Sequence, residues 1–256
     1  SESQGLQSIA VGNKSGSSNQ GVVAVAIGNS AGRDNQGVGS VSIGNVSGTN
    51  NQRVDSIAIG NTAGQHSQGN QAVAIGNLAG LTNQGASAIA IGQNAGWQYQ
   101  TQNAVAIGTS AGYETQGDSA IAIGYNAGYT GQGPNTIALG RTAGNTSQSD
   151  SSIAIGLQSG QNNQGAVSVA LGAYAGQNGQ GAHCVAIGEY AGYYDQSPYS
   201  IVLNASGYQL DGTDSGLYIN PVRYTAAQDP TDDGIMFYNQ TTKEVRYSYA
   251  LDGGSF

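Results

Sequence analysis

The sequence has few of the residue types that reactive and metal-binding sites use. Its 256 residues include one cysteine, one methionine, one tryptophan, two phenylalanines and two histidines. The single cysteine, Cys184, excludes an internal disulfide framework. No apolar run approaches the roughly 18 residues that a membrane-spanning helix needs, so no membrane insertion is expected.

Charged residues are also scarce, and basic residues are fewer than acidic ones. Seven Lys and Arg residues stand against fifteen Asp and Glu residues, which gives a formal net charge of -8. Only Lys14, Arg33, Arg53 and Arg141 are basic within the first 200 positions. Because phosphate binding requires clustered basic side chains, we expect no nucleic acid partner.

Glycine is abundant, and most of the 42 glycines follow a fixed period. The pattern Gly-x-x-x-Gly-x-x-x-Gln recurs every 16 residues, twelve times without insertion or deletion, from Gly12 to Gln196. A fixed period of this kind marks a stacked-repeat architecture. Sixteen residues are too few for a helix pair and suit one coil of a β-solenoid. The sequence therefore predicts an all-β parallel β-solenoid of twelve to thirteen coils, which is a rod.

Each unit contains a short aliphatic strand before its first glycine, which we call position 0. Position −3 is always Ile or Val, and position −1 is always Ile, Val or Leu. Position −2 between them is Ala in eleven of the twelve units and Ser42 in the other. This alternation predicts a strand. The glycines at positions 0 and +4 are expected to end it in tight turns with positive φ.

The alanine row at position −2 suggests that the strand is covered on both faces. A solvent-facing position would vary among Lys, Glu, Gln and Thr, whereas this one is restricted to Ala and Ser. A strand buried on both faces needs a second packing surface. Nothing else in the repeat supplies one, so we predict lateral self-association. The candidate subunit interface is Ala26, Ala58, Ala74, Ala90, Ala106, Ala122, Ala138, Ala154, Ala170 and Ala186.

The glutamine at position +8 is unbroken through the repeat. Stacked glutamine side chains can hydrogen-bond amide to amide along the stacking axis. We therefore favour a structural ladder over the alternative, a ligand-binding row. The ladder comprises Gln20, Gln36, Gln52, Gln68, Gln84, Gln100, Gln116, Gln132, Gln148, Gln164, Gln180 and Gln196.

The unit Ser119-Ala120-Ile121-Ala122-Ile123-Gly124-Tyr125-Asn126-Ala127-Gly128 resembles the head-domain repeat of YadA-like trimeric autotransporter adhesins. The resemblance covers roughly residues 5–207 and is specific in the strand core, although the period is longer here. It implies a left-handed parallel β-roll in which three chains pack around an axis. The partner that it implies is therefore the chain itself, as a homotrimer.

The repeat decays near its end, which predicts two regions. We expect a β-solenoid domain over residues 1–207 and a C-terminal β cap, neck or joining segment over residues 208–256. Residues 200–204 form a thirteenth strand with Asn204 in place of glycine, and residues 234–248 predict a β-hairpin with a polar turn. These last segments are similar to those that follow solenoid repeats in fibre proteins of phages and large DNA viruses.

Aromatic residues begin at Trp97. Trp97, Tyr113 and Tyr129 occupy position +5 of three successive units, and Tyr193 occupies it later. Exposed aromatic rows can bind sugar faces or act as hot spots. These four residues are the candidate site for a host-surface glycan or receptor, with simple ladder stabilisation as the alternative. Ice binding would need a near-invariant Thr array, and Thr is scattered here.

The sequence contains no converging set of catalytic groups. His66 and His183 occupy different positions seven coils apart, and there is no CxxC, P-loop or calcium-binding repeat. We therefore expect no enzymatic activity, cofactor or metal. The favoured interpretation is an extracellular fibre or adhesin rod on a cell or virion surface, associating laterally as a trimer. An end-to-end polymerising filament and a glycan- or receptor-binding module are the open alternatives.

Overall fold

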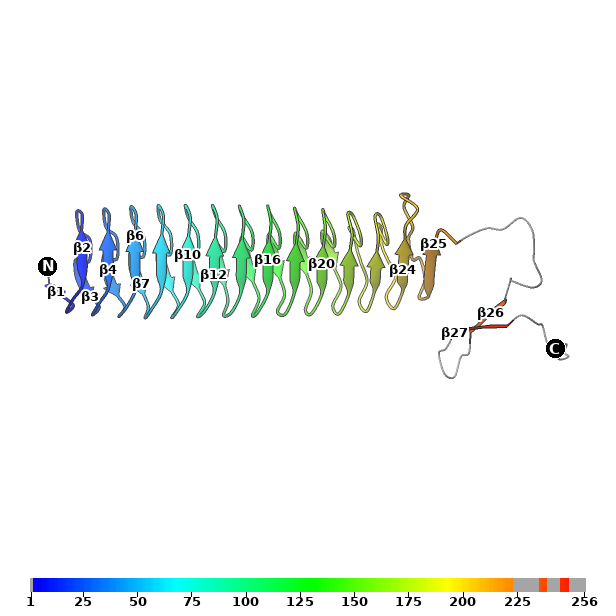
Figure 1. Cartoon of the computed structure of the whole chain (residues 1–256), viewed down its shortest axis with the longest axis horizontal. Helices are drawn as coiled ribbons and strands as arrows, with labels where there is room; N and C mark the ends of the chain where they lie inside the picture. Colours follow the sequence, from blue (N-terminus) through cyan, green and yellow to red (C-terminus); the bar gives the residue numbers. More distant parts are fainter. Residues whose placement is uncertain (1, 223–234, 239–244, 249–256) are drawn as a thin grey trace. The chain divides into compact units, whose positions relative to one another are not determined.

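The computed structural model describes residues 2–222, 235–238 and 245–248. The chain divides into two compact units, Ser1–Asn220 and Pro221–Phe256. In the first unit, coils of 16 residues stack in chain order into a parallel β-solenoid of about 13 turns (Figure 1). The predicted fold class is therefore confirmed.

The larger sheet of the solenoid has 14 parallel strands, and it contains the strands that the sequence predicted. Most are three residues long and cover positions −3 to −1. They are β2 (Ile9–Val11), β4 (Val25–Ile27), β6 (Val41–Ile43), β8 (Ile57–Ile59), β10 (Val73–Ile75), β12 (Ile89–Ile91), β14 (Val105–Ile107), β16 (Ile121–Ile123), β18 (Ile137–Leu139), β20 (Ile153–Ile155), β22 (Val169–Leu171), β23 (Val185–Ile187), β24 (Ile201–Asn204) and β25 (Leu217–Asn220).

A second sheet of 11 parallel strands covers positions +6 to +8, and sequence reasoning did not identify it. Each of its strands ends on the repeated glutamine or, in β1, on the upstream Gln4. The strands are β1 (Glu2–Gln4), β3 (Ser18–Gln20), β5 (Asp34–Gln36), β7 (Asn50–Gln52), β9 (His66–Gln68), β11 (Thr82–Gln84), β13 (Gln98–Gln100), β15 (Glu114–Gln116), β17 (Thr130–Gln132), β19 (Thr146–Gln148) and β21 (Asn162–Gln164).

Pairing along the rod follows the sequence period. Ala106 of β14 lies opposite Ala122 of β16, and Gln116 of β15 lies opposite Gln132 of β17, in each case 16 residues away. Because the register equals the repeat, each repeat position stacks on the same position of the neighbouring coil. Backbone bonds outside the strands also join neighbouring coils, as in the 2.9 Å bond from Gly112 N to Ala127 O.

The interior between the two sheets is narrow and is filled by small side chains from one sheet and by glutamines from the other. Ala58 and Ala63 are fully buried, and they belong to an alanine cluster that runs from coil to coil. A Cβ added to Gly64 would lie 2.8 Å from the Gln68 Oε1 atom and 3.1 Å from the Ala58 Cβ atom. Position +4 is therefore glycine both for its φ of 54° and for lack of space.

The glycine at position 0 has a different requirement. Gly124 has a φ of 130°, and a Cβ there would lie 2.6 Å from the Gly140 carbonyl oxygen of the next coil. A side chain would meet backbone, which cannot move aside without opening the stack. The predicted positive-φ turns at both repeated glycines are thus confirmed. Positions +2, +7 and −5 also have positive φ, with residues such as Asn94, Asn83 and Asn103.

The solenoid extends further than the predicted boundary at residue 207. β24 pairs with β23, as expected for a thirteenth strand, and β25 then adds to β24 through Leu217 opposite Ile201. The first compact unit therefore ends at Asn220. In the second unit, β26 (Ile235–Tyr238) and β27 (Val245–Ser248) form the predicted antiparallel pair. Its expected turn lies outside the described residues.

Candidate functional site

The outward face of the larger sheet is a continuous aliphatic surface, which we call the aliphatic face. Within each strand the central residue is buried and its neighbours point outward, as in Ile121, Ala122 and Ile123 of β16. Both outward rows consist only of Ile, Val and Leu in all twelve units. Several of these side chains are substantially exposed, for example Leu139 at 41% and Leu171 at 42%.

The alanine row is not part of this surface, so the predicted candidate interface is wrong at the level of side chains. Every member is fully buried inside its own coil, with an exposed fraction of 0%: Ala26, Ala58, Ala74, Ala90, Ala106, Ala122, Ala138, Ala154, Ala170 and Ala186. A side chain that is already covered within one chain cannot contact a second chain. The restriction to Ala and Ser reflects the narrow interior, where a larger side chain would overpack.

The glutamine row lies inside the coil opposite the alanines, and all twelve members are buried. Each Nε2 group donates to the carbonyl of the position −3 residue in the larger sheet; Gln132 Nε2, for example, lies 2.9 Å from Ile121 O. Amide-to-amide bonds also follow the rod axis, as from Gln148 Nε2 to Gln164 Oε1 at 3.1 Å. Such bonds join six of the eleven consecutive pairs, so the expected ladder forms in part, and the glutamines also join the two sheets.

Three of the four predicted aromatic site residues form one stack of rings. The rings of Trp97 and Tyr113 stack with centroids 4.7 Å apart, and those of Tyr113 and Tyr129 stack at 4.7 Å with an interplanar angle of 3°. The stacking covers both faces of the Tyr113 ring. Because sugars bind to open ring faces, this geometry favours ladder stabilisation over a sugar platform. Receptor binding by these residues remains a prediction.

Tyr193 belongs to a separate group, which we call the tyrosine corner: Tyr174, Tyr190, Tyr193 and Tyr194. The rings of Tyr174 and Tyr190 stack at 4.8 Å with an interplanar angle of 2°. Tyr193 meets the Tyr190 ring edge-on at 5.4 Å, and Tyr194 meets Tyr193 at 4.3 Å with an angle of 79°. Sequence reasoning placed Tyr193 with the Trp97 row because the residues share position +5, whereas the structure groups it with the tyrosines at position +2.

Two tyrosine hydroxyls are perturbed. The pKa of Tyr113 lies above its usual value, first because burial disfavours the phenolate and then because Tyr129 and Glu114 repel it. The pKa of Tyr193 is also raised, first by its hydrogen bond with Tyr194 and then by burial. Both shifts keep the hydroxyls protonated at neutral pH, so neither tyrosine is activated as a base.

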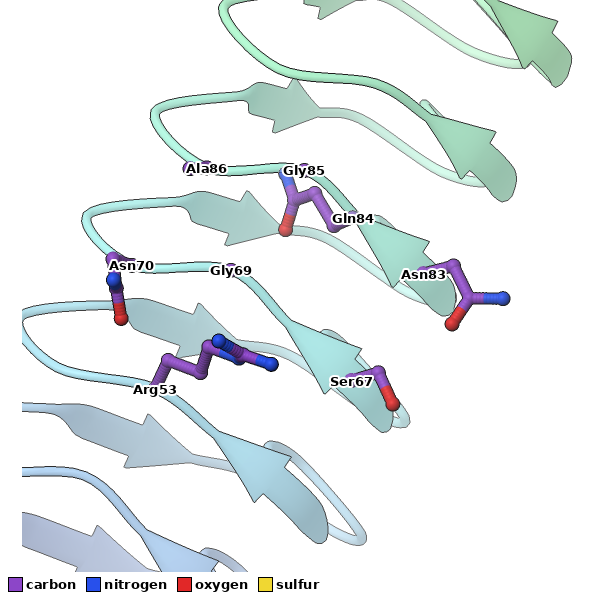
Figure 2. Close-up of a pocket in the computed structure, with 8 residues that line it drawn as sticks. All are labelled: Arg53, Ser67, Gly69, Asn70, Asn83, Gln84, Gly85 and Ala86. Carbon is purple, nitrogen blue, oxygen red and sulfur yellow. The ribbon is translucent and has the colours of Figure 1, made fainter.

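A shallow groove of about 320 Å³ lies where the chain leaves the smaller sheet, at the ends of β9 and β11. Figure 2 shows its glycine floor, Gly69 and Gly85, with Arg53, Asn70 and Asn83 extending from three successive coils around it. Arg53 occupies the same repeat position as Gly69 and Gly85, so the floor position is not restricted to glycine. The groove has one charged side chain and no aromatic one, and we assign it no ligand.

Reactive groups do not converge in the described part of the chain. No cluster of three or more His, Cys, Asp or Glu side chains suited to a metal ion occurs among the described residues. Cys184 is buried in the interior, where its Sγ lies 3.0 Å from the Ser197 carbonyl oxygen. The part of the chain that the structure describes contains no helix able to cross a bilayer.

Comparison with known proteins adds no relative to this picture. No family model, no curated protein and no solved structure matches the chain.

Proposed function

We propose that this chain is a non-enzymatic structural rod of a cell or virion surface, and that three copies associate laterally through the aliphatic face. The observation that carries the proposal is the composition of that face. Twelve successive units place only Ile, Val or Leu at both outward positions of the larger sheet. Single exposed apolar residues are ordinary, but an uninterrupted double row is not.

The size of the aliphatic face supports burial against a partner. Two rows about 7 Å apart, repeated at about 4.8 Å over twelve coils, cover about 400 Å². The largest apolar patch of a monomeric protein is typically about 300 to 600 Å², and such patches are often interaction sites. The smaller sheet differs, because its outward position +6 carries polar residues such as Asn50, Thr82 and Glu114. Of the two sheets, only the larger one is therefore built for apolar contact.

The trimeric state rests on the resemblance of the strand core to adhesin heads of the YadA-like type. Each coil offers one flat aliphatic side, and three such sides can close around a common axis without leaving any of them exposed. A closed arrangement also explains why the row is not interrupted by charged residues, which elsewhere protect exposed sheets from further association.

The experiment is the assembly state of two variants by sedimentation and light scattering. Ile91→Asp combined with Ile123→Asp places two charges in the aliphatic face, two coils apart so that they do not repel each other at close range. We expect the trimer to dissociate into monomers. The matched control, Thr146→Asp, places a charge on the exposed outward position of the smaller sheet and should leave the trimer intact. A wild-type monomer, or an unchanged trimer in the double variant, would refute the proposal.

An end-to-end filament is the second candidate function. The strand β25 pairs with β24 on one side, and no described strand pairs with its other edge. Free strand edges favour the addition of another strand. Negative-stain microscopy of the wild-type protein separates the candidates, because a closed trimer gives rods of one length and the filament gives fibres of many lengths.

A further inference from the structure

The two halves of the solenoid differ in chemistry. Residues 1–96 contain no Trp, Tyr or Phe, and every aromatic residue of the chain lies at or after Trp97. Charge follows the same division. In residues 1–100 three acidic residues are balanced by three basic ones, whereas residues 142–222 contain five acidic residues and no Lys or Arg. The far half of the rod is therefore both aromatic and acidic.

Within that half, the tyrosine corner differs in geometry from the Trp97 row. The Trp97 row is a single parallel stack. In the tyrosine corner the ring of Tyr193 stands at 64° to the rings of both Tyr174 and Tyr190, and Tyr194 stands at 79° to Tyr193. The rings of Tyr193 and Tyr194 are therefore not stacked face to face on a neighbouring ring, as the ring of Tyr113 is. The side chain of Tyr194 is 49% exposed.

Two of these tyrosines occupy a costly backbone conformation. Tyr174 and Tyr190 have φ angles of 59° and 54°. Bulky residues seldom adopt this region, and Asn94 and Asn126 hold the same position in other coils. The same positive φ occurs at position +2 of every coil, including Val46 and Leu78, so the geometry of the coil imposes it.

Carboxylates accompany the tyrosine corner. Glu189 directly precedes Tyr190, and Asp195 directly follows Tyr194; both are exposed. Asp211 lies against the same segment, because its Oδ1 accepts the Tyr194 backbone N–H at 2.9 Å. The local field is therefore negative, and no Lys or Arg between residues 142 and 222 offsets it.

We propose that the tyrosine corner binds an arginine or lysine side chain of a basic partner polypeptide. The negative ring faces attract a cation, and guanidinium is the commonest partner in such contacts. The flanking carboxylates add charge complementarity and steer a basic partner toward this end of the rod. The tyrosine corner occupies positions +2, +5 and +6, outside the aliphatic face, so this binding does not depend on lateral association.

The test uses a short poly-arginine peptide as the probe, measured by isothermal titration with the full chain. Tyr174→Asn combined with Tyr190→Asn removes the stacked rings without changing the charge, at positions where other coils carry Asn. We expect affinity to fall about 2- to 5-fold, as loss of an exposed cation–π contact predicts. Tyr193→Asn, which matches Asn145 at position +5, should weaken binding in the same way and leaves the strained positions untouched.

Tyr125→Asn is the matched control. Tyr125 is an exposed tyrosine, 53% accessible, away from the corner, and its replacement should leave the affinity unchanged. If wild type and all variants bind the peptide equally, general attraction to an acidic rod explains the binding and the proposal fails. If the peptide does not bind, but a glycan array gives binding that the corner variants lose, the site recognises a sugar and the proposal is likewise overturned.

Discussion

Gln116 and Val105 join the two sheets of the solenoid through one hydrogen bond. Gln116 Nε2, in β15, donates to the Val105 carbonyl oxygen, in β14, at 2.8 Å. The same amide donates to Ala120 O at 3.1 Å, and its Oε1 accepts from Gln100 Nε2 at 3.1 Å. One fully buried side chain therefore satisfies backbone on the opposite side of the coil and connects to the coil before it.

Replacing this glutamine should be costly. Gln116→Ala removes the donor from two buried carbonyl groups and leaves a cavity, so we expect a loss of about 2 to 4 kcal/mol in the free energy of unfolding. Chemical denaturation monitored by circular dichroism measures it. Gln98→Ala, at the outward position +6 of the preceding coil, is the control and should change stability by less than about 0.5 kcal/mol. Equal losses would show that the interior bonds contribute little.

Ala122 tests the width of the interior. Ala122→Leu inserts three carbon atoms where a Cβ on the neighbouring Gly128 would already lie 3.1 Å from the alanine Cβ. We expect overpacking to cost about 1 to 3 kcal/mol or more. Ala122→Ser should be tolerated, because Ser42 occupies this position in another coil and donates to Gln52 Oε1. Thermal unfolding of both variants tests this expectation. If the leucine variant were as stable as the serine variant, the interior would not be as narrow as we describe.

Glycine at position 0 is required by contact with the next coil as well as by conformation. Gly124→Ala brings a Cβ to 2.6 Å from the Gly140 carbonyl oxygen, whereas a Cβ on Gly131, with a φ of 70°, has its nearest neighbour at 3.8 Å. Gly131→Ala should therefore cost only the conformational term of about 1 to 2 kcal/mol. We expect Gly124→Ala to lose clearly more stability in urea unfolding. The clash would be irrelevant if the two variants unfolded at the same urea concentration.

Val46 offers a stabilising change. This β-branched residue has a φ of 59° at position +2, where Asn94 and Asn126 have similar angles. Asn tolerates this region far better than Val, so Val46→Asn should raise the free energy of unfolding by about 0.5 to 1 kcal/mol. Val54→Asn is the control, because Val54 is exposed and does not have a positive φ. A melting temperature that falls for Val46→Asn would show that the valine contributes through packing instead.

The candidate site was only partly predictable. The stacking of Trp97 on Tyr113 followed from a shared position in a register equal to the repeat. The contact of Tyr193 with Tyr174 and Tyr190 did not follow from the sequence. It depends on the distance between positions +2 and +5 across a turn. Spacing along a sequence carries no measure of that distance.

The sequence by itself determined the parallel solenoid and its 16-residue coil. It also determined the strand before each first glycine, the turns at the two glycines and the stacking of equivalent positions in neighbouring coils. These follow from a period without insertions, since any register other than 16 would break the match between neighbouring coils. Only the tertiary structure decided which side of the strand faces inward. Ile121, Ala122 and Ile123 would satisfy the alternation of a strand in either orientation. The interior between two three-residue strands has room for alanine and glutamine, so the larger aliphatic side chains must lie outside.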